Sequence, residues 1–340
     1  MTDRELVIDG RRIADNEKAY VIGDVGHNHA GSMGKLKAMV LSAKESGVDA
    51  VKFQTRHPKE VYAPHEYYRK SDNVQWMDET YGIHREKLEW SRDEWKYIFD
   101  FCSEVGITAF STPFDFRSLD LLVGLDVPAI KIASGDATNL PLIEKASEVG
   151  VPLIISTGGT TQEEVDEIVE TMEKSGTPFA LLQCSCIYPA PHDVLNLSAI
   201  STFRERYPSI TTGLSTHDPE SHPTLAGFAL GGRIFEHHYT NNRRWKGTDN
   251  SFSLTPPMMK LLRRQLDDLS DAMGSGEKQP DPREASYTLE RRKSLYWSDS
   301  GISIMCPGGG IEPKFYEQLN DTPPMQPITV GAAVKWSDFE

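Results

Sequence analysis

The chain repeats one pattern eight times: a short β-rich run, then a segment with the period of an amphipathic helix. The helical period is clear where Trp95, Ile98, Phe99 and Cys102 recur at i, i+3, i+4 and i+7. Eight such units favour a (β/α)8 TIM barrel over an open doubly wound sheet, and no Gly-x-Gly-x-x-Gly turn follows the first run. The predicted strands cover residues 20–26, 50–55, 108–112, 129–134, 153–157, 179–185, 211–217 and 233–240.

The boundaries of this barrel follow from changes in the pattern. Residues 1–16 read as a small hairpin with an Asp9-Gly10 turn, which we expect to plug the bottom of the barrel. Residues 17–283 form the predicted barrel domain. After a polar linker rich in glycine and proline, residues 284–340 predict a small C-terminal β module, the alternative being an irregular tail.

Net charge and cysteine usage limit the classes of partner. The formal net charge is −14, which argues against a nucleic-acid or anionic-membrane partner and requires local positive charge for any anionic substrate. The four cysteines lack the spacing of a disulfide framework or a zinc finger, and Cys184 and Cys186 are too close for a routine disulfide. With a charged start and no apolar span, the sequence predicts a reduced, cytoplasmic protein.

Near the ends of the predicted strands, the residues that point into the barrel are polar. The active sites of such barrels lie at the C-terminal ends of the strands. Lys52 and Lys131 both face inward, and a buried ammonium costs several kcal/mol unless it is paired. One interpretation is structural pairing with Asp24, Asp136 and Glu236. The other is a socket for phosphate or carboxylate oxygens, completed by the hydroxyls of Thr112, Ser134, Ser156 and Ser215.

Two histidines also end predicted neighbouring strands. His217 and His238, beside the carboxylate of Glu236, can hold one divalent metal while leaving positions open for other ligands. Two structural histidines held by hydrogen bonds are the alternative. Taken with the lysines, the pair predicts an anionic small molecule bound beside a Lewis acid.

These residues lie in motifs that resemble the sialic acid synthase (N-acetylneuraminate synthase) family. The match runs through most of residues 20–256 in order. Its motifs are Gly23-Asp24-Val25-Gly26-His27-Asn28-His29-Ala30-Gly31-Ser32, Val51-Lys52-Phe53-Gln54-Thr55, Phe110-Ser111-Thr112-Pro113-Phe114, Lys131-Ile132-Ala133-Ser134-Gly135, Ile155-Ser156-Thr157-Gly158, Ile187-Tyr188-Pro189, Gly213-Leu214-Ser215 and Glu236-His237-His238-Tyr239-Thr240.

The resemblance implies an enzyme that condenses phosphoenolpyruvate with a sugar aldehyde, commonly N-acetylmannosamine, to give a 2-keto-3-deoxy acid and phosphate. It implies a barrel with a small antifreeze-like cap and a domain-swapped homodimer. By position, it assigns phosphoenolpyruvate to Lys52, Thr112, Lys131, Ser134, Ser156 and Ser215, the sugar to Gln54, Tyr188 and Asp249, and Mn²⁺ or Mg²⁺ to His217 and His238. The candidate catalytic carboxylates are Asp24, Asp136 and Glu236.

The chain departs from the family pattern at several of these positions. Asp24 and Asp136 stand where the family usually has glutamate. Cys186 stands before Ile-Tyr-Pro, where the family usually has asparagine or serine. The cap is shortened, and its usual Arg-Pro-Gly is here Cys306-Pro307-Gly308. In the family, that arginine reaches across the dimer to the N-acyl group of the sugar.

Three hypotheses about function therefore stay open. The first is a family enzyme with a nonstandard acceptor, such as an aldehyde without an N-acetyl group. The second is an ordinary sialic, legionaminic or pseudaminic acid synthase in which another arginine replaces the missing one. The third is a non-catalytic protein that binds a phosphorylated metabolite. Candidates for the replacing arginine are Arg243, Arg244, Arg291 and Arg292.

Overall fold

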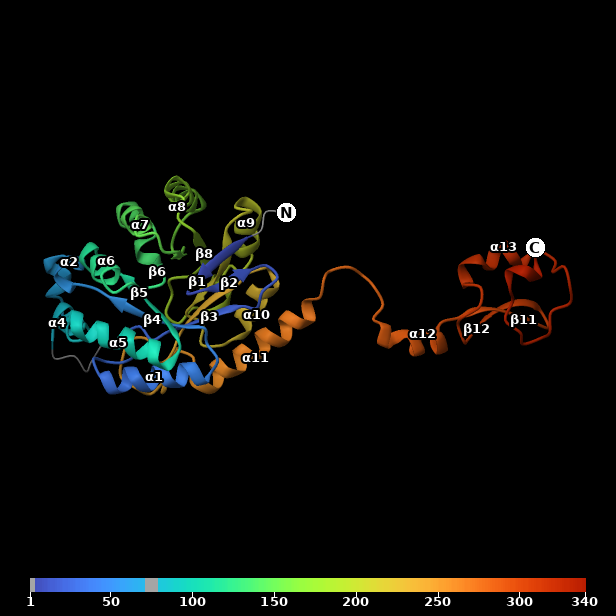
Figure 1. The fold of residues 1–340 in the computed structure, drawn as a ribbon, viewed down its shortest axis with the longest axis horizontal. Helices are drawn as coiled ribbons and strands as arrows, with labels where there is room; N and C mark the ends of the chain where they lie inside the picture. Colours follow the sequence, from blue (N-terminus) through green and yellow to red (C-terminus); the bar gives the residue numbers. More distant parts are fainter. Residues whose placement is uncertain (1–3, 71–78) are drawn as a thin grey trace. The chain divides into compact units, whose positions relative to one another are not determined.

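A closed barrel of eight parallel strands forms the first part of the protein, with helices around it (Figure 1). The structure is a computed structural model that describes residues 4–70 and 79–340. Strand order follows the chain, and β10 closes the barrel against β3. The (β/α)8 prediction is confirmed. Contacts divide the chain into two compact units, Met1–Gly274 and Ser275–Glu340.

The barrel strands and the main helices alternate along the chain. The strands are β3 (Tyr20–Asp24), β4 (Ala50–Thr55), β5 (Thr108–Pro113), β6 (Ile130–Ile132), β7 (Leu153–Ser156), β8 (Phe179–Gln183), β9 (Thr211–Thr216) and β10 (Ile234–His238). The helices are α1 (Met33–Glu45), α2 (Pro58–Val61), α3 (Pro64–Tyr67), α4 (Tyr81–Glu86), α5 (Arg92–Val105), α6 (Phe116–Val123), α7 (Leu140–Ser147), α8 (Gln162–Ser175), α9 (Ala199–Arg206), α10 (His222–Ala229) and α11 (Pro256–Met273).

Local sequence signals explain where these elements begin and end. The side chain of Ser91 caps α5 and that of Thr161 caps α8, each in a capping box completed by a glutamate three residues later. Both helices end at a left-handed glycine, Gly106 and Gly176, where a side chain would strain the backbone. β6 is shorter than predicted because Ser134–Asp136 turns into a 3-10 helix, η1.

A hairpin fills the N-terminal end of the barrel. β1 (Glu5–Ile8) and β2 (Arg11–Ala14) pair through a turn in which Asp9 and Gly10 have φ values of 50° and 74°. The buried side chains of Leu6, Ile8 and Ile13 join one apolar cluster with the inward residues of the barrel strands. The expected plug is therefore present, and the open end of the barrel is the C-terminal one.

The second unit has a small core of its own. It contains η3 (Pro282–Glu284), α12 (Ala285–Arg291), the antiparallel pair β11 (Ser294–Ser298) and β12 (Gly301–Met305), η4 (Pro313–Phe315), α13 (Tyr316–Asn320) and η5 (Trp336–Asp338). Leu295, Ile302, Ile311, Leu319 and Val334 form its buried cluster. Its likeness to an antifreeze-type cap stays a prediction. Among the helices of the described ranges, none combines the length and apolar character needed to cross a membrane.

Candidate active site

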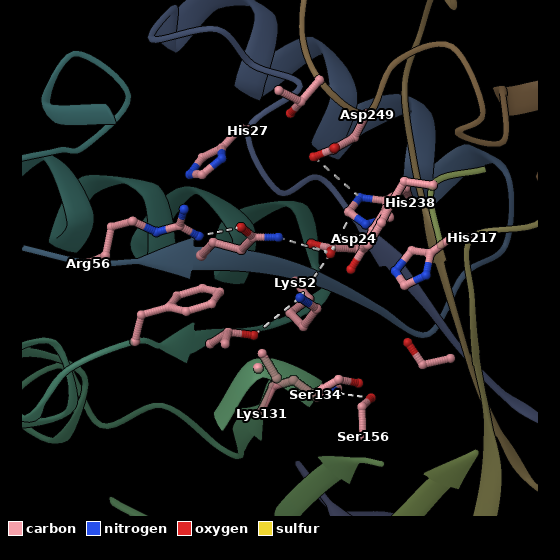
Figure 2. Close-up of a pocket in the computed structure, with 18 of the residues that line it drawn as sticks. Asp24, His27, Lys52, Arg56, Lys131, Ser134, Ser156, His217, His238 and Asp249 are labelled. Atoms are coloured by element: carbon pink, nitrogen blue, oxygen red, sulfur yellow. Dashed lines mark hydrogen bonds and ion pairs between the residues drawn. The ribbon is translucent and has the colours of Figure 1, made fainter. Parts of the chain in front are cut away.

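A cavity of about 460 Å³ opens at the C-terminal ends of the barrel strands (Figure 2). Inward side chains meet there because alternate strand residues point to the barrel axis. Thirteen of the fourteen predicted site residues line this cavity. They are Asp24, Lys52, Gln54, Thr112, Lys131, Ser134, Ser156, Tyr188, Ser215, His217, Glu236, His238 and Asp249.

Asp136 is the predicted site residue that does not line the cavity. It lies in η1, and its carboxylate accepts a hydrogen bond of 3.0 Å from the amide of Asn139. Burial raises the pKa of this carboxyl, against the amide hydrogen bond and Arg56. Ser134, two residues earlier, does line the cavity and accepts a hydrogen bond of 2.9 Å from the amide of Gly158.

Lys52 sits on the cavity floor with two carboxylates. Its Nζ lies 2.9 Å from Oδ2 of Asp24 and 3.7 Å from Oε1 of Glu236, and it donates to the hydroxyl of Thr112 at 3.2 Å. Burial lowers the pKa of Lys52, but Asp24 and Glu236 outweigh burial and raise it above the usual range. The lysine is therefore charged at neutral pH.

Lys131 is the second buried lysine of the floor, and its partners are neutral. Its Nζ donates to the hydroxyl of Ser156 at 2.6 Å and to the carbonyl of Ile132 at 2.7 Å. None of the ion pairs found within residues 4–70 and 79–340 includes Lys131. Burial lowers its pKa, and the charge of Glu236 opposes this only in part. A ligand that brings an anion to this lysine would supply the missing partner.

The two predicted metal ligands lie side by side. The rings of His217 and His238 have centroids 5.5 Å apart and an interplanar angle of 36°. Nδ1 of His217 lies 2.9 Å from the carbonyl oxygen of Ser185. If Nδ1 carries the proton for this hydrogen bond, Nε2 is free to bind a metal. Burial, then the charge of His238, lowers the pKa of His217 to about 4, so its ring is neutral at pH 7.

Acidic oxygens surround His238. Its Nδ1 lies 3.6 Å from Oδ2 of Asp24 and 4.0 Å from Oδ2 of Asp249. Three polar atoms here are buried without a hydrogen-bond partner: Nδ1 of His238, Oδ1 of Asp24 and Oε2 of Glu236. Such orphaned atoms are costly unless a ligand satisfies them. A divalent cation fits this donor set of imidazole nitrogens and carboxylate oxygens.

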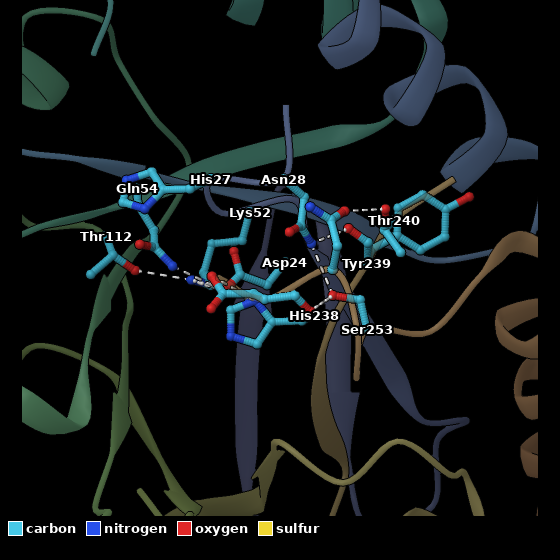
Figure 3. Close-up of polar contacts among 12 residues, drawn as sticks. Asp24, His27, Asn28, Lys52, Gln54, Thr112, His238, Tyr239, Thr240 and Ser253 are labelled. Atoms are coloured by element: carbon cyan, nitrogen blue, oxygen red, sulfur yellow. Dashed lines mark hydrogen bonds and ion pairs between the residues drawn. The ribbon is translucent and has the colours of Figure 1, made fainter. Parts of the chain in front are cut away.

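A hydrogen-bond network fixes the strand ends that carry these groups (Figure 3). The side-chain amide of Asn28 donates to the carbonyl of Tyr239 and to the hydroxyl of Ser253, both at 2.9 Å. It therefore ties the loop after β3 to the segment that follows His238. Gln54 donates to Oδ2 of Asp24 at 3.3 Å and so orients this carboxylate.

Two arginines in the cavity wall were not predicted. Arg56 lies over the ring of Phe114 at 4.0 Å and donates to Oε1 of Gln54 at 2.6 Å. Arg85 donates to the hydroxyl of Tyr81 at 3.0 Å and contacts His27. Figure 2 shows Arg56 and His27 across the cavity from the histidine pair. Arg56 directly follows the predicted strand 50–55. This position at a strand end was the one feature of the sequence that could have indicated it as a site residue.

The remaining lining residues that sequence reasoning missed are His27, Tyr62, Tyr81, Phe114, Ala133, Gly135, Cys184 and Thr248. Among them, Cys184 contacts Cys186, and all four cysteines of the chain are free thiols. The Cys184 thiol, acting against burial, lowers the pKa of Cys186 to about 6, with further help from Ser134 and Lys131. The pKa of Cys186 therefore lies below that of an ordinary thiol.

Comparisons with known proteins point to one family. The model of the NeuB family matches residues 39–278. N-acetylneuraminate-9-phosphate synthase of Drosophila melanogaster is 36% identical over 257 residues, covering 75% of this chain and 68% of that protein. N,N'-diacetyllegionaminic acid synthase of Campylobacter jejuni is 30% identical and covers 89% of this chain and 95% of its own length. The crystal structure of N-acetylneuraminic acid (sialic acid) synthetase from Leptospira borgpetersenii is 27% identical, with a TM-score of 0.76 over 84% of this chain and 95% of that one.

Proposed function

The chain belongs to the NeuB family, and from this premise we propose that it condenses phosphoenolpyruvate with a sugar aldehyde. The products would be a 2-keto-3-deoxy sugar acid of the sialic acid type and inorganic phosphate. The names of its relatives, synthases of sialic and legionaminic acids, support an enzyme of this type. The cavity supports the same conclusion from the chemistry of its residues.

The observation that carries the proposal is the buried Lys131. Its ammonium group lies among hydroxyls and carbonyls with no carboxylate within ion-pair distance in the described part of the chain. Phosphoenolpyruvate carries both a phosphate and a carboxylate. One would pair with Lys131 and the hydroxyls of Ser134 and Ser156, and the other with Lys52 and Thr112.

The acceptor would bind above phosphoenolpyruvate, beside His217 and His238. These residues, with Asp24 or Asp249, would hold Mn²⁺ or Mg²⁺, and such an ion supplies Lewis acidity toward the acceptor carbonyl. Gln54, Tyr188 and Asp249 would contact the rest of the acceptor.

The reaction would form one carbon–carbon bond and would replace the C2–O bond to phosphate by a C2–O bond to an oxygen atom from water. C3 of phosphoenolpyruvate attacks the aldehyde carbon, the aldehyde oxygen takes up a proton, and positive charge develops at C2. Asp24 and Glu236, both beside Lys52, would stabilise that charge. Water then adds at C2, and loss of phosphate leaves the 2-keto group.

A phosphate-release assay tests the proposal. The purified protein is given phosphoenolpyruvate, Mn²⁺ and one member of a panel of aldoses, with N-acetylmannosamine, mannose and diacetamido hexoses included. Release of phosphate that depends on one aldose, with a 2-keto acid detected in equal amount, is the expected result. Calorimetric binding of phosphoenolpyruvate without turnover of any aldose would instead identify a binding protein.

A further inference from the structure

A second group of metal-binding side chains lies outside the cavity, on the surface loops that follow β8 and β9. His192 begins the short helix η2 (His192–Val194), Glu220 lies in the loop after β9, and His222 begins α10. One ligand atom from each residue lies within 4.8 Å of the other two. Within residues 4–70 and 79–340, this is the one group of three or more such residues that meets this distance.

The spacing of the three side chains suits a small metal ion. Nδ1 of His222 lies 3.1 Å from Oε2 of Glu220, and the rings of His192 and His222 have centroids 4.8 Å apart. Ligand atoms bonded at about 2.0–2.2 Å to a tetrahedral ion lie roughly 3.4 Å from one another. All three side chains are largely exposed, so small rotations can bring them onto one ion.

A buried carboxylate beneath His192 points to a ligand independently. The side chain of Asp218 is fully buried, and its Oδ1 accepts the amide hydrogen of Glu220 at 2.6 Å. Its Oδ2 lies 2.9 Å from Nε2 of His192 but receives no well-aligned hydrogen bond. Histidines that bind metals commonly hold a carboxylate with their other ring nitrogen, which fixes the tautomer. With Nδ1 of His192 as the ligand atom, Asp218 is placed to do this through Nε2.

We propose that His192, Glu220 and His222, supported by Asp218, bind a divalent transition metal of the zinc type. Two imidazoles and one carboxylate favour Zn²⁺, Co²⁺ or Ni²⁺ over Mg²⁺ and Ca²⁺, which take mainly oxygen ligands. The fourth position would face solvent and hold water.

The bound ion would join two loops on the rim of the cavity. One backbone hydrogen bond already links these two loops, from the amide of Ala190 to the carbonyl of His217 at 3.2 Å. Tyr188 packs on the ring of His217 with centroids 3.9 Å apart. The metal would therefore brace the loops that carry Tyr188 and His217, whether or not the protein catalyses the proposed condensation.

The test counts metal in the full-length protein after the cavity histidines are removed. In the His217→Ala/His238→Ala background, equilibrium dialysis against Zn²⁺ near neutral pH should leave one equivalent bound, measured by mass spectrometry of the metal. Co²⁺ in place of Zn²⁺ should give a visible d–d absorption band. Adding His192→Ala or His222→Ala should weaken Zn²⁺ binding by about tenfold or more, and Asp218→Asn by roughly ten- to a hundredfold.

His65 is an exposed histidine on α3. The variant His65→Ala is the matched control and should bind Zn²⁺ like its parent. Circular dichroism and thermal melting without metal report whether each variant folds. If Asp218→Asn does not fold, the variants of the exposed His192 and His222 still test the proposal. Zn²⁺ binding that is unchanged when both His192 and His222 are replaced would overturn the proposal. So would a folded parent that retains no Zn²⁺ at micromolar concentrations.

Discussion

The ammonium nitrogen of Lys52 lies 2.9 Å from Oδ2 of Asp24, and both side chains are almost fully buried. Lys131, on the next strand but one, has a hydroxyl and a carbonyl in place of a carboxylate. The floor of the cavity therefore holds one ammonium that the protein neutralises and one that it does not. This difference lets the two lysines be told apart by experiment.

Replacing either lysine by alanine should weaken phosphoenolpyruvate binding severely. Each removes charge-assisted contacts worth roughly 1.5–3 kcal/mol, or about tenfold or more in affinity. Isothermal titration calorimetry measures the loss, with the exposed Lys96→Ala as control. If Lys52→Ala and Lys131→Ala both bind phosphoenolpyruvate like the parent, the assignment of the anion site is wrong.

The same lysines should differ in their effect on the free energy of unfolding. Lys52→Met leaves Asp24 and Glu236 without their cation, and breaking a buried pair this way costs about 3–5 kcal/mol. Lys131→Met removes a buried cation that lacks an anion, so stability should stay the same or rise. Urea unfolding of the ligand-free proteins compares them. Equal destabilisation of the two variants would contradict this reading of Lys131.

The histidine pair should be needed for turnover and not for folding. His217→Ala and His238→Ala each remove a proposed ligand of the metal, so phosphate release should fall to background while the circular dichroism spectrum stays that of the parent. A chelator should have the same effect on the parent, reversed by added Mn²⁺. Full turnover in metal-free buffer would refute the role of the pair.

Glu89 should make the stability of the protein fall as pH rises. Burial, against the opposing charge of Arg56, raises the pKa of Glu89 from 4.5 to about 7. Between these values the folded state holds a proton that the unfolded state has lost. The contribution of Glu89 to the free energy of unfolding is therefore fully present below pH 4.5 and disappears as pH passes 7.

Glu89→Gln keeps an acceptor for the backbone amide of Arg56 and removes the titration. The loss of unfolding free energy from pH 4.5 to 7.5 should be smaller in this variant, by a difference on the order of 3 kcal/mol. Urea midpoints at several pH values measure it. Parallel pH profiles for parent and variant would show that Glu89 does not titrate in this range.

Position 306 should influence which acceptor is preferred. The Cys306 thiol cannot donate the forked, charged hydrogen bonds of the arginine that the family resemblance places at this position. Its Sγ donates to the carbonyl of Arg291 at 3.4 Å. Loss of such a contact costs on the order of 1.5–3 kcal/mol. We expect kcat/KM to favour an acceptor other than N-acetylmannosamine, with Cys306→Arg shifting the preference toward it.

The competing hypothesis is that Arg243, Arg244, Arg291 or Arg292 replaces the missing arginine. Arg243 donates to the carbonyls of Ser253 and Pro219, so it is already occupied within the barrel unit. A clear preference of the parent for N-acetylmannosamine over mannose and diacetamido hexoses, unimproved by Cys306→Arg, would favour that hypothesis. The predicted domain-swapped dimer is checked separately by sedimentation.

The barrel and most of the cavity could be predicted because both depend on a period of two. Strand β4 has the predicted bounds, and the phase that puts Val51 and Phe53 toward the helices puts Lys52 into the barrel. Where the chain leaves the strand, this rule fails. Asp136 lies in the turn of η1 and does not line the cavity, although Ser134, at the start of the same turn, does.

Residues outside the strands could not be placed in the same way. Arg85 lies in α4 and Tyr62 follows α2, and such short elements have too few residues to show a period. Their positions depend on contacts with distant residues, such as that of Arg85 with His27. Likewise, His192 and Glu220 come together only because the loops after β8 and β9 are neighbours at the rim.

The hairpin that fills the lower end of the barrel also has a kinetic consequence. Leu6, Ile8 and Ile13 are packed into the N-terminal end, so all ligands must enter and leave through the C-terminal end. A molecule on the lysine floor is then covered by whatever binds above it at the histidines. Phosphoenolpyruvate would have to bind first and the sugar second, and product inhibition patterns should show this compulsory order.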